Sequence, residues 1–426
     1  MLASLLRKVK NRQAKVCIIG LGRVGLPLAV VLADNGINVL GLDADEKRTS
    51  KIASGRAPFR ENMLDGYLAA AISQGKFTVA QSIESARSCD LFIVAVGTPV
   101  TERLNVEDSQ LIDAISELSR LDLRDKGIAI RSTTAPGTLV NLVRPLIEEK
   151  TGLHAGRDFA LAACPERILE GRAMEELQTL PEIIGGIDDT SGSIFSELFM
   201  SISPQKEVIS CRPIEAELAK LFTNTYRYVN FALSNELAII AEKYGADAHR
   251  VIQIANHGYP RSNIPEPGLS GGPCLGKDGF LLDSGRHDNS IVYNAWLLNE
   301  SVPSYILSQL ERKLGRLKGR RISVLGLAFK AGSDDIRLSP AARLVDLLRE
   351  HGAVVTVHDP NIKSTSGMSE AMKRPEAIIV AMNHAQFRTE ARTLDESGAR
   401  IVYDVWGLYE ERRFKHAEYV RFGSGA

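Results

Sequence analysis

Short apolar runs alternate with longer stretches of helical periodicity over the first half of the chain. Five of these runs have the length and composition of buried strands: Val16–Ile19, Val39–Leu42, Leu91–Val96, Gly127–Ser132 and Phe159–Ala162. Strands that alternate with helices in this way are typical of a parallel, doubly wound sheet. The pattern therefore predicts an α/β domain over residues 1–210.

The pattern turns helical in the middle of the chain and returns to α/β near the end. Ile214–Tyr244 and Asn289–Leu314 are long helical stretches, and Pro303 is expected to bend the second because proline removes a backbone donor. A second series follows, with strands predicted at Arg321–Leu325, Val354–His358, Ala377–Ala381 and Ile401–Tyr403 and a helix at Pro340–His351. We expect a central helical domain over residues 211–317 and a second Rossmann-like domain over residues 318–426.

Charge and composition argue against several classes of function. The 426 residues contain 52 Lys and Arg against 52 Asp and Glu, so the formal net charge is zero. Without a net positive field, we predict no nucleic-acid partner. The apolar window from Val16 to Ala33 is interrupted by Arg23, Pro27 and glycines, which predicts a strand, a turn and a helix and no membrane span.

The N-terminus and the cysteines bear on location. The first ten residues are basic without a long apolar core, so they do not form a signal peptide; we expect a frayed arm, with a short amphipathic helix as the alternative. The five cysteines are odd in number and lack a CxxC pair, which argues against a disulfide scaffold and a cysteine zinc site and favours the cytoplasm. The eight histidines lack HxH, HxxH and HExxH groupings, so no metal is expected.

A glycine-rich motif, Gly20-Leu-Gly22-Arg23-Val24-Gly25, lies between the first predicted strand and a helical pattern. The first glycine permits a tight turn, the second admits a pyrophosphate and the third allows helix–strand packing. Asp43 ends the next strand 23 residues after Gly20, a spacing that suits a ribose hydroxyl and favours NAD over NADP. Thr98 and Thr133 follow later strands and are candidate cofactor contacts, although either residue can instead cap a helix.

A second set of candidates lies in the helical middle. Lys220 and Asn224 are four residues apart and share a helix face. The loop-like stretch Tyr259–Gly279, rich in proline and glycine, contains Gly271-Gly-Pro-Cys274 with Asp278 four residues further on. A helix that begins near Cys274 would lower its thiol pKa and favour the nucleophilic thiolate. The alternatives are a buried inert cysteine and a solvated surface lysine.

Together these motifs resemble the UDP-glucose/GDP-mannose dehydrogenase family, the NAD-dependent nucleotide-sugar 6-dehydrogenases. The resemblance covers nearly the whole chain. It rests on Gly20–Gly25, Val96–Pro99, Ser132–Thr138, Cys164–Arg167 with Gly171, Lys220–Arg227, Asn235-Glu236, Gly271–Asp278, Gly326–Lys330 and Asp334–Pro340. The order and spacing of these segments are specific to the family.

The resemblance implies two successive hydride transfers to NAD that convert a C6 alcohol into a carboxylate. Cys274 would attack the C6 aldehyde to give a thiohemiacetal, and a second oxidation would give a thioester that water hydrolyses. Lys220 and Asn224 would stabilise the developing oxyanion. Asp278, together with a water near Thr133 and Glu166, would transfer protons.

The resemblance also assigns binding residues. The cofactor set is Gly20, Gly22, Arg23, Val24, Gly25, Asp43, Arg48, Thr98, Thr133 and Arg337, with Arg48 toward the adenosine phosphate. The substrate set is Glu166, Glu170, Lys220, Asn224, Arg261, Gly271 and Lys330, with Arg261 lent by a neighbouring subunit of a homodimer. For the pair Glu166 and Glu170, the alternative is a solvated turn that Arg167 and Arg172 neutralise.

The substrate is expected to be a UDP-sugar whose uridine half binds the last domain. There Gly326-Leu-Ala-Phe-Lys330 replaces a complete dinucleotide fingerprint. The segment Ala255–Asn263 resembles the members that act on N-acetylhexosamines, so UDP-N-acetylmannosamine or UDP-N-acetylglucosamine ranks first and UDP-glucose second. Members of this kind supply surface-polysaccharide biosynthesis. His257 is either a substrate contact or an ordinary loop histidine.

Two competing interpretations remain. One is a single-step, two-electron dehydrogenase of the hydroxyacid type, which would share the NAD domain and the Lys/Asn pair without using a thiol. The other is a nucleotide-sensing or scaffold protein built on an inactive dehydrogenase. The presence of Cys274, Lys220, Asn224 and Asp278 together argues against loss of activity.

Overall fold

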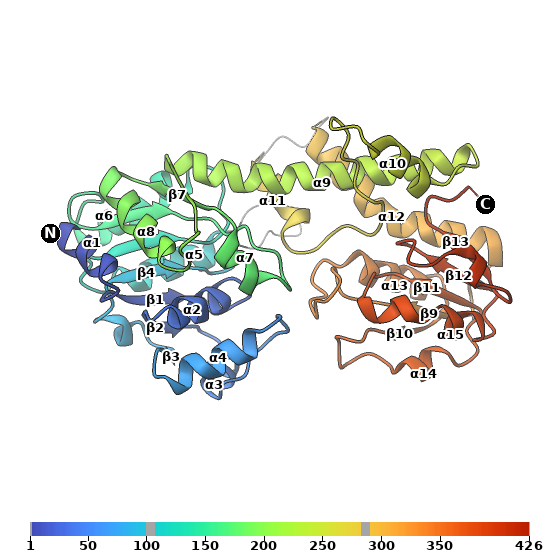
Figure 1. Ribbon diagram of the computed structural model, residues 1–426, viewed down its shortest axis with the longest axis horizontal. Coiled ribbons are helices and arrows are strands. Elements are labelled where there is room, and N and C mark those ends of the chain that lie inside the picture. The colour runs from blue at the N-terminus through green and yellow to red at the C-terminus, as the bar shows by residue number, and fades with distance from the viewer. Residues whose placement is uncertain (1, 99–106, 283–289, 426) are drawn as a thin grey trace. The chain divides into compact units, whose positions relative to one another are not determined.

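The computed structural model describes residues 2–98, 107–282 and 290–425 (Figure 1). These residues form two compact units. The first runs to Thr223 and takes in the segment from Phe280, and the second contains Asn224–Gly279 and the rest of the chain. The division into domains 1–210, 211–317 and 318–426 stays a prediction. Two residues at the ends of predicted segments, Pro99 and Asn289, lie outside the described residues.

The first unit is built on an eight-stranded sheet in the order β3-β2-β1-β4-β5-β6-β7-β8. The strands are β1 Lys15–Ile19, β2 Asn38–Leu42, β3 Phe77–Ala80, β4 Leu91–Val94, β5 Gly127–Ile130, β6 Ala160–Ala163, β7 Glu182–Gly186 and β8 Val208–Cys211. All neighbours are parallel except β6 and β7. The five predicted strands are confirmed with shifts of one or two residues, whereas β3, β7 and β8 were not predicted.

Helices cover both faces of this sheet, because alternate side chains of each strand point to opposite sides. Val16 and Ile18 of β1 belong to the apolar core on one face, and Cys17 belongs to the core on the other. The helices of this part of the chain are α1 Leu2–Lys10, α2 Gly25–Asp34, α3 Glu46–Ala53, α4 Leu64–Ser73, α5 Ser109–Leu118, α6 Arg144–Thr151, α7 Ala173–Thr179 and α8 Asp189–Met200.

The expectation of a frayed N-terminal arm was wrong. Leu2, Leu5 and Val9 follow one another at helical spacing and are buried in the core of the first unit. Lys8 Nζ lies 2.8 Å from Asp90 Oδ1 and adds an ion pair. The alternative of a short amphipathic helix is therefore the observed one, since burial of one apolar face orders the segment.

The second unit contains a parallel sheet in the order β10-β9-β11-β12-β13. Its strands are β9 Arg321–Leu325, β10 Val354–His358, β11 Ala377–Val380, β12 Ile401–Asp404 and β13 Glu418–Arg421, of which β13 was not predicted. The remaining helices are α9 Pro213–Lys243, which continues from the first unit, α10 Ala248–Asn256, α11 Leu275–Leu282, α12 Ile291–Leu314, α13 Pro340–Glu350, α14 Met368–Ala371 and α15 Ala391–Asp395. Helix α12 continues through Pro303.

Each sheet has a point at which the strand order reverses, between β1 and β4 in the first and between β9 and β11 in the second. Ligands of open α/β sheets bind outside the carboxyl ends of the strands at such a point. The glycine motif follows β1, and the Gly326 loop follows β9. The predicted loop Tyr259–Gly279 is irregular only up to Cys274, because α11 begins at Leu275.

Candidate active site

The glycine motif after β1 has the geometry that a dinucleotide requires. Gly20 has φ +96°, and a Cβ on Gly25 would lie only 1.9 Å from the carbonyl oxygen of Gly20. A Cβ on Gly22 would meet nothing within 4 Å, so the backbone is open to a ligand there. The residue before α2, Val24, gives this helix no side-chain cap, so the positive end of the helix dipole is open to a phosphate. These residues fit NAD.

Asp43 and Arg48 lie together beyond the end of β2. Asp43 Oδ2 accepts hydrogen bonds from the Leu21 amide and from Arg48 Nη1, both at 2.8 Å. Asp43 Oδ1 accepts from the Asp45 amide at 2.9 Å. The aspartate is thus held beyond the carboxyl end of β2, where this fold binds an adenosine ribose, and its contact with a ribose stays a prediction.

The loops after β4 and β5 are tied to each other. Thr98 Oγ1 donates to the carbonyl oxygen of Thr133 at 2.5 Å, and Ser132 Oγ donates to that of Val96 at 2.7 Å. Two further predicted residues also meet, since Arg23 Nη1 lies 3.5 Å from Glu170 Oε2. This contact joins a cofactor candidate to a substrate candidate.

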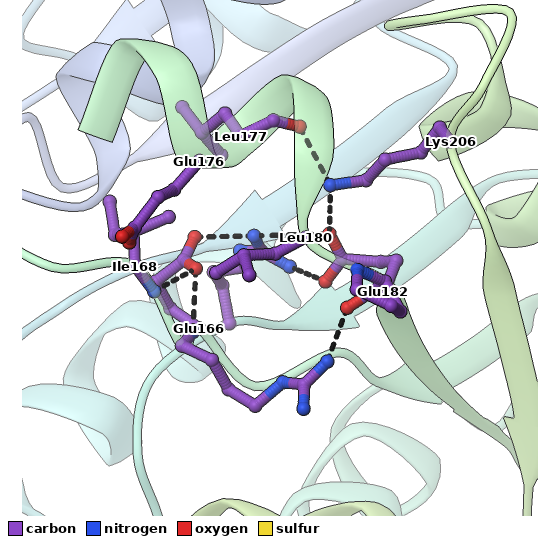
Figure 2. Close-up of a pocket in the computed structure, with 10 residues that line it drawn as sticks. Glu166, Ile168, Glu176, Leu177, Leu180, Glu182 and Lys206 are labelled. Carbon is purple, nitrogen blue, oxygen red and sulfur yellow. Dashed lines mark hydrogen bonds and ion pairs between the residues drawn. The ribbon is translucent and has the colours of Figure 1, made fainter. Parts of the chain in front are cut away.

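Glu166 belongs to a buried group of charges that we call the Arg131 cluster: Arg131, Glu166, Glu182 and Lys206 (Figure 2). Arg131, which is 1% exposed, forms ion pairs with Glu166 and with Glu182. Lys206 Nζ lies 3.5 Å from Glu182 Oε2. Arg131 also donates to the Cys164 carbonyl oxygen at 3.1 Å. The solvated turn considered for Glu166 was wrong.

Glu217 connects α9 to the loop that follows β5. Its buried carboxylate accepts hydrogen bonds from the amides of Gly137 at 2.6 Å and Leu139 at 2.9 Å. Lys220 is one turn further along α9 and is 7% exposed, so its surface alternative was wrong. Asn224 follows at the next turn, which puts all three side chains on one helix face.

Cys274 is exposed and immediately precedes α11. Its carbonyl oxygen accepts the Asp278 amide at 3.0 Å, so the thiol stands at the first turn of this helix. The buried Asn224 Nδ2 donates to Asp278 Oδ2 at 2.6 Å. Asp278 Oδ1 forms an ion pair with Lys277, whose Nζ lies 3.2 Å away. Cys274, Asn224 and Asp278 thus lie close together in the second unit.

The loop before Cys274 packs on the loop that carries Lys330 and Arg337. The Gly272 amide donates to the Leu338 carbonyl oxygen at 2.9 Å. A Cβ on Gly272 would lie 2.3 Å from the Phe329 ring. A Cβ on Gly271 would likewise lie 2.6 Å from Pro340 Cγ. Two glycines in succession are therefore needed for this approach.

The loop after β9 repeats the construction seen after β1. Gly326 has φ +94°, and Asp359 Oδ2 accepts from the amides of Leu327 at 2.7 Å and Ala328 at 3.0 Å. Here the partner is His384 Nε2, 3.0 Å from the same oxygen, rather than an arginine. His384 seals the carboxylate of Asp359, which is 3% exposed, so this unit lacks the open ribose acceptor of a dinucleotide site.

Three further candidate residues are Arg261, Arg337 and His257. Arg261 stacks on the Tyr259 ring at 4.5 Å, in an exposed turn. Arg337 pairs with Asp335 at 2.6 Å, and its side chain is 63% exposed. His257 is exposed at the end of α10. Their roles stay predictions.

Sequence reasoning missed several residues that the fold brings together, namely Arg131, Glu182, Lys206, Glu217, Asp359 and His384. Arg131 gave a usable signal, because a charged residue that ends an apolar strand must find a partner. The other partners come from distant segments, and no local pattern marks them.

Three family models match consecutive parts of the chain. They are the NAD binding domain of the UDP-glucose/GDP-mannose dehydrogenase family at residues 14–203, its central domain at residues 214–301 and its UDP binding domain at residues 323–411. The chain belongs to the UDP-glucose/GDP-mannose dehydrogenase family. It is therefore an NAD-dependent nucleotide-sugar dehydrogenase, and the resemblance drawn from its motifs is confirmed.

Individual members of the family support the same conclusion. A UDP-N-acetyl-D-mannosamine dehydrogenase from Pyrococcus horikoshii is 34% identical over 88% of this chain and 90% of its own length. Another from Campylobacter jejuni is 31% identical over 88% and 97%. A solved structure of the Pyrococcus enzyme aligns with a TM-score of 0.90 at 32% identity and covers 96% of this chain and 99% of its own.

The described residues contain neither a membrane-spanning helix nor a metal-binding group. None of their helices is long and apolar enough to cross a membrane. Within the same residues, no group of three or more His, Cys, Asp or Glu side chains is arranged to bind a metal ion.

Proposed function

We propose that this family member oxidises the C6 alcohol of a UDP-N-acetylhexosamine to the carboxylate in two steps at one site. The observation that carries the proposal is Cys274, exposed at the start of α11 and one turn from the buried Asn224–Asp278 pair. A thiol at a helix N-terminus favours the thiolate, which can trap an aldehyde. A dehydrogenase limited to one oxidation needs no such group.

When bound at the glycine motif, NAD⁺ would supply the hydride acceptor for each of the two oxidations. Between them, the Cys274 sulfur forms a bond to C6 of the aldehyde, and the second oxidation converts this thiohemiacetal into a thioester. Water then forms the new C–O bond, the C–S bond breaks, and the thiolate leaves. Lys220 and Asn224 stabilise the oxyanion at C6. The sum is one alcohol, two NAD⁺ and one water to one carboxylate, two NADH and three protons.

The choice of sugar rests on the names of the relatives. The two described above are named UDP-N-acetyl-D-mannosamine dehydrogenases, and their identity extends over most of this chain. UDP-N-acetylmannosamine is therefore the first candidate and UDP-N-acetylglucosamine the second, with UDP-glucose as the alternative. The uronate product would serve surface-polysaccharide biosynthesis, and the cytoplasmic location of the enzyme stays a prediction.

We further propose a homodimer. Exposed apolar side chains recur on α9 at Tyr226, Leu233 and Ile240, a spacing that keeps them on one face of the helix. Exposed apolar stripes of this kind mark protein–protein contacts. We assign this stripe to a second copy of the chain. Arg261 is also exposed and would be available to a neighbouring subunit.

The test is a panel of UDP-sugars incubated with NAD⁺, with NADH followed by absorbance and the product by mass. The proposal predicts two NADH per sugar and a uronate, with UDP-N-acetylmannosamine as the best substrate. One NADH per sugar would favour the single-step dehydrogenase instead. Binding of NAD⁺ and UDP-sugar without any NADH would favour the sensing protein.

Replacement of the thiol tests the nucleophile. Cys274→Ser keeps the size of the side chain but removes the sulfur, so net formation of the uronate should fall by at least about 10³-fold. Cys211→Ser is the matched control, because Cys211 is a partly exposed thiol on β8 that has no proposed role. Equal uronate formation by both variants would remove Cys274 from the mechanism.

A further inference from the structure

The loop that leads to Cys274 is held by polar side chains of two helices. The described residues 262–274 contain neither helix nor strand, and yet Leu269 is 1% exposed and Ser270 is 9% exposed. Irregular backbone in a buried place must find hydrogen-bond partners for its amides and carbonyl oxygens. In this loop, side chains of α9 and α10 supply several of those partners, and the proposed reaction uses none of these side chains.

The first part of the loop is fixed at two successive residues, Ile264 and Pro265. Asn256 of α10 binds both backbone groups of Ile264, since its Oδ1 accepts from the amide at 3.0 Å and its Nδ2 donates to the carbonyl oxygen at 2.9 Å. Ser262 Oγ donates to the same Asn256 Oδ1 at 2.7 Å. Ser234 of α9, which is buried, donates through Oγ to the Pro265 carbonyl oxygen at 2.5 Å. The loop is thus tied to α10 first and to α9 next.

Asn235 of α9 holds the loop closer to the cysteine. Its buried side chain accepts the Gly268 amide at Oδ1, at 2.8 Å. Its Nδ2 donates to Asn299 Oδ1 of α12 at 3.0 Å, and Asn299 Nδ2 donates to the Tyr228 carbonyl oxygen at 3.2 Å. A buried amide is costly unless its oxygen and its NH₂ group are both bonded. These partners therefore give Asn235 one orientation, with the oxygen toward Gly268.

Contact with Trp406 is a second constraint on Gly268. A Cβ at this glycine would lie 2.8 Å from the indole ring, so the loop backbone lies directly against the ring. The indole is itself fixed, since its Nε1 donates to the Ala381 carbonyl oxygen at 2.9 Å. The next residue, Leu269, belongs to the apolar core of the second unit. The loop is therefore held at Gly268 both by the Asn235 amide and by the packing around it.

The same helix holds the other end of the segment that contains the cysteine. Asn224 Nδ2 donates to Asp278 Oδ2 at 2.6 Å, and Asn224 precedes Asn235 by eleven residues. Eleven residues make about three helical turns, so the two amides lie on one face of α9, about 16 Å apart along its axis. Gly268 and Asp278 are thus attached to one face of one helix, and Cys274 lies between them in the chain.

We infer that Asn235 is a positioning residue that holds Cys274 in place to trap the aldehyde, an inference that rests on the proposed function. In the trapping step a bond forms between the Cys274 sulfur and C6, and the π electron pair of the carbonyl group moves to its oxygen. A displacement of about 1 Å is enough to slow such a step about 10²-fold. The first oxidation forms no bond to sulfur, so it does not depend on the position of Cys274.

The first test is Asn235→Leu, which keeps the branching of the side chain and removes both of its hydrogen bonds. Single turnovers of UDP-N-acetylmannosamine are followed with enzyme and NAD⁺ in excess. The first NADH should form at nearly the wild-type rate and the second about 10²-fold more slowly, with free aldehyde recovered as a hydrazone after quenching. Asn294→Leu is the matched control, because Asn294 is an exposed amide on α12 that donates to the Ser290 carbonyl oxygen.

The split between the two steps separates positioning from simple loss of stability. A destabilised protein with fewer folded molecules would form both NADH more slowly by the same factor. Equal slowing of both steps in Asn235→Leu, or no slowing of either, would therefore overturn the inference.

Hydrogen exchange of the wild-type protein tests the anchor without any variant. The Gly268 amide, bonded to a buried side chain, should exchange at least about 10³-fold more slowly than in an unstructured peptide, measured by mass spectrometry resolved to single residues. Exchange at the rate of the unstructured peptide would overturn the inference even if the Asn235→Leu protein does not fold.

Failure of the proposed function would look different. In that case the wild-type protein would release fewer than two NADH per sugar or none, before any variant is made. If the wild type releases two NADH and the Asn235→Leu protein forms both at the wild-type rates, the proposed function stands and only the positioning role is wrong.

Discussion

Replacement of Asp359 by asparagine should destabilise the second unit selectively. Asp359 Oδ2 accepts from the amides of Leu327 and Ala328 and from His384 Nε2, while its Oδ1 accepts from the Asn361 amide at 2.9 Å. Every partner is a donor, and only a carboxylate offers acceptors on both sides. In the variant, the amide NH₂ must face at least one of these donors.

The magnitude follows from the lost interactions. A buried donor left without an acceptor costs about 1–3 kcal/mol, and the remaining bonds fall from the strength of charged to that of neutral hydrogen bonds. We therefore expect Asp359→Asn to lower the free energy of unfolding of this unit by about 3 kcal/mol. Asp346→Asn is the control: Asp346 is an exposed aspartate on α13, and its replacement should cost less than about 0.5 kcal/mol.

Urea unfolding followed by tryptophan fluorescence measures the effect in the right place. Both tryptophans of the chain, Trp296 and Trp406, belong to the second unit, so their emission reports on that unit alone. The same variant should raise the KM for the UDP-sugar and leave the KM for NAD⁺ unchanged, because the altered loop lies in the UDP binding domain. Equal stability of the Asp359 and Asp346 variants would refute the reasoning.

The difference in stability between wild type and Asp359→Asn should depend on pH, and the pKa of Asp359 gives the sign of that dependence. Burial opposes ionisation of Asp359, but the hydrogen bond and the charge of His384 outweigh it and lower the pKa. A lowered pKa gives stability that is present above the ordinary aspartate value of 3.8 and is lost as the pH falls through the folded value. Wild type and Asp359→Asn should therefore differ at neutral pH and converge in acid.

Three further predictions follow from other parts of the structure. Gly25→Ala should abolish NAD⁺ binding in calorimetry, because the new Cβ would lie 1.9 Å from the Gly20 carbonyl oxygen; an unchanged Kd would contradict this reading of the loop. Lys220→Met should lower kcat by about 10²–10³-fold with little change in sugar affinity, as expected for lost oxyanion stabilisation, and a change confined to KM would exclude that role. Leu233→Glu should shift the mass measured by light scattering from that of a dimer to that of a monomer. An unchanged dimer mass would show that the α9 stripe is not the interface.

Most of the fold was predictable because its strands are buried on both faces. Such strands read as continuous apolar runs, as in Leu91–Val94 and Ala377–Val380. The missed strands lack this signal. Strand β8, Val208–Cys211, is an edge strand with two exposed central residues, and β7 begins with a glutamate and ends in two glycines. The ion pairs with Arg131 and Lys206 explain a glutamate in that place.

The candidate site was predictable where its residues are close in sequence. Lys220 and Asn224 are one helical turn apart, and periodicity alone places them on one face, whereas Cys274 and Asp278 were linked only by their closeness in sequence. The start of α11 was hidden, because Gly276 and Gly279 lower helix propensity in the segment that follows the cysteine. Contacts such as Arg131 to Glu182 join segments 51 residues apart, and only the folded chain shows them.

Mass spectrometry of the enzyme quenched in acid during turnover tests the central claim most directly. If Cys274 traps the aldehyde and is then oxidised with it to a thioester, the peptide that contains Cys274 will carry the sugar nucleotide through a bond labile to hydroxylamine. The Cys274→Ser protein will lack this adduct. A wild-type enzyme that releases two NADH per sugar with no modified cysteine at any time of quenching would contradict the account.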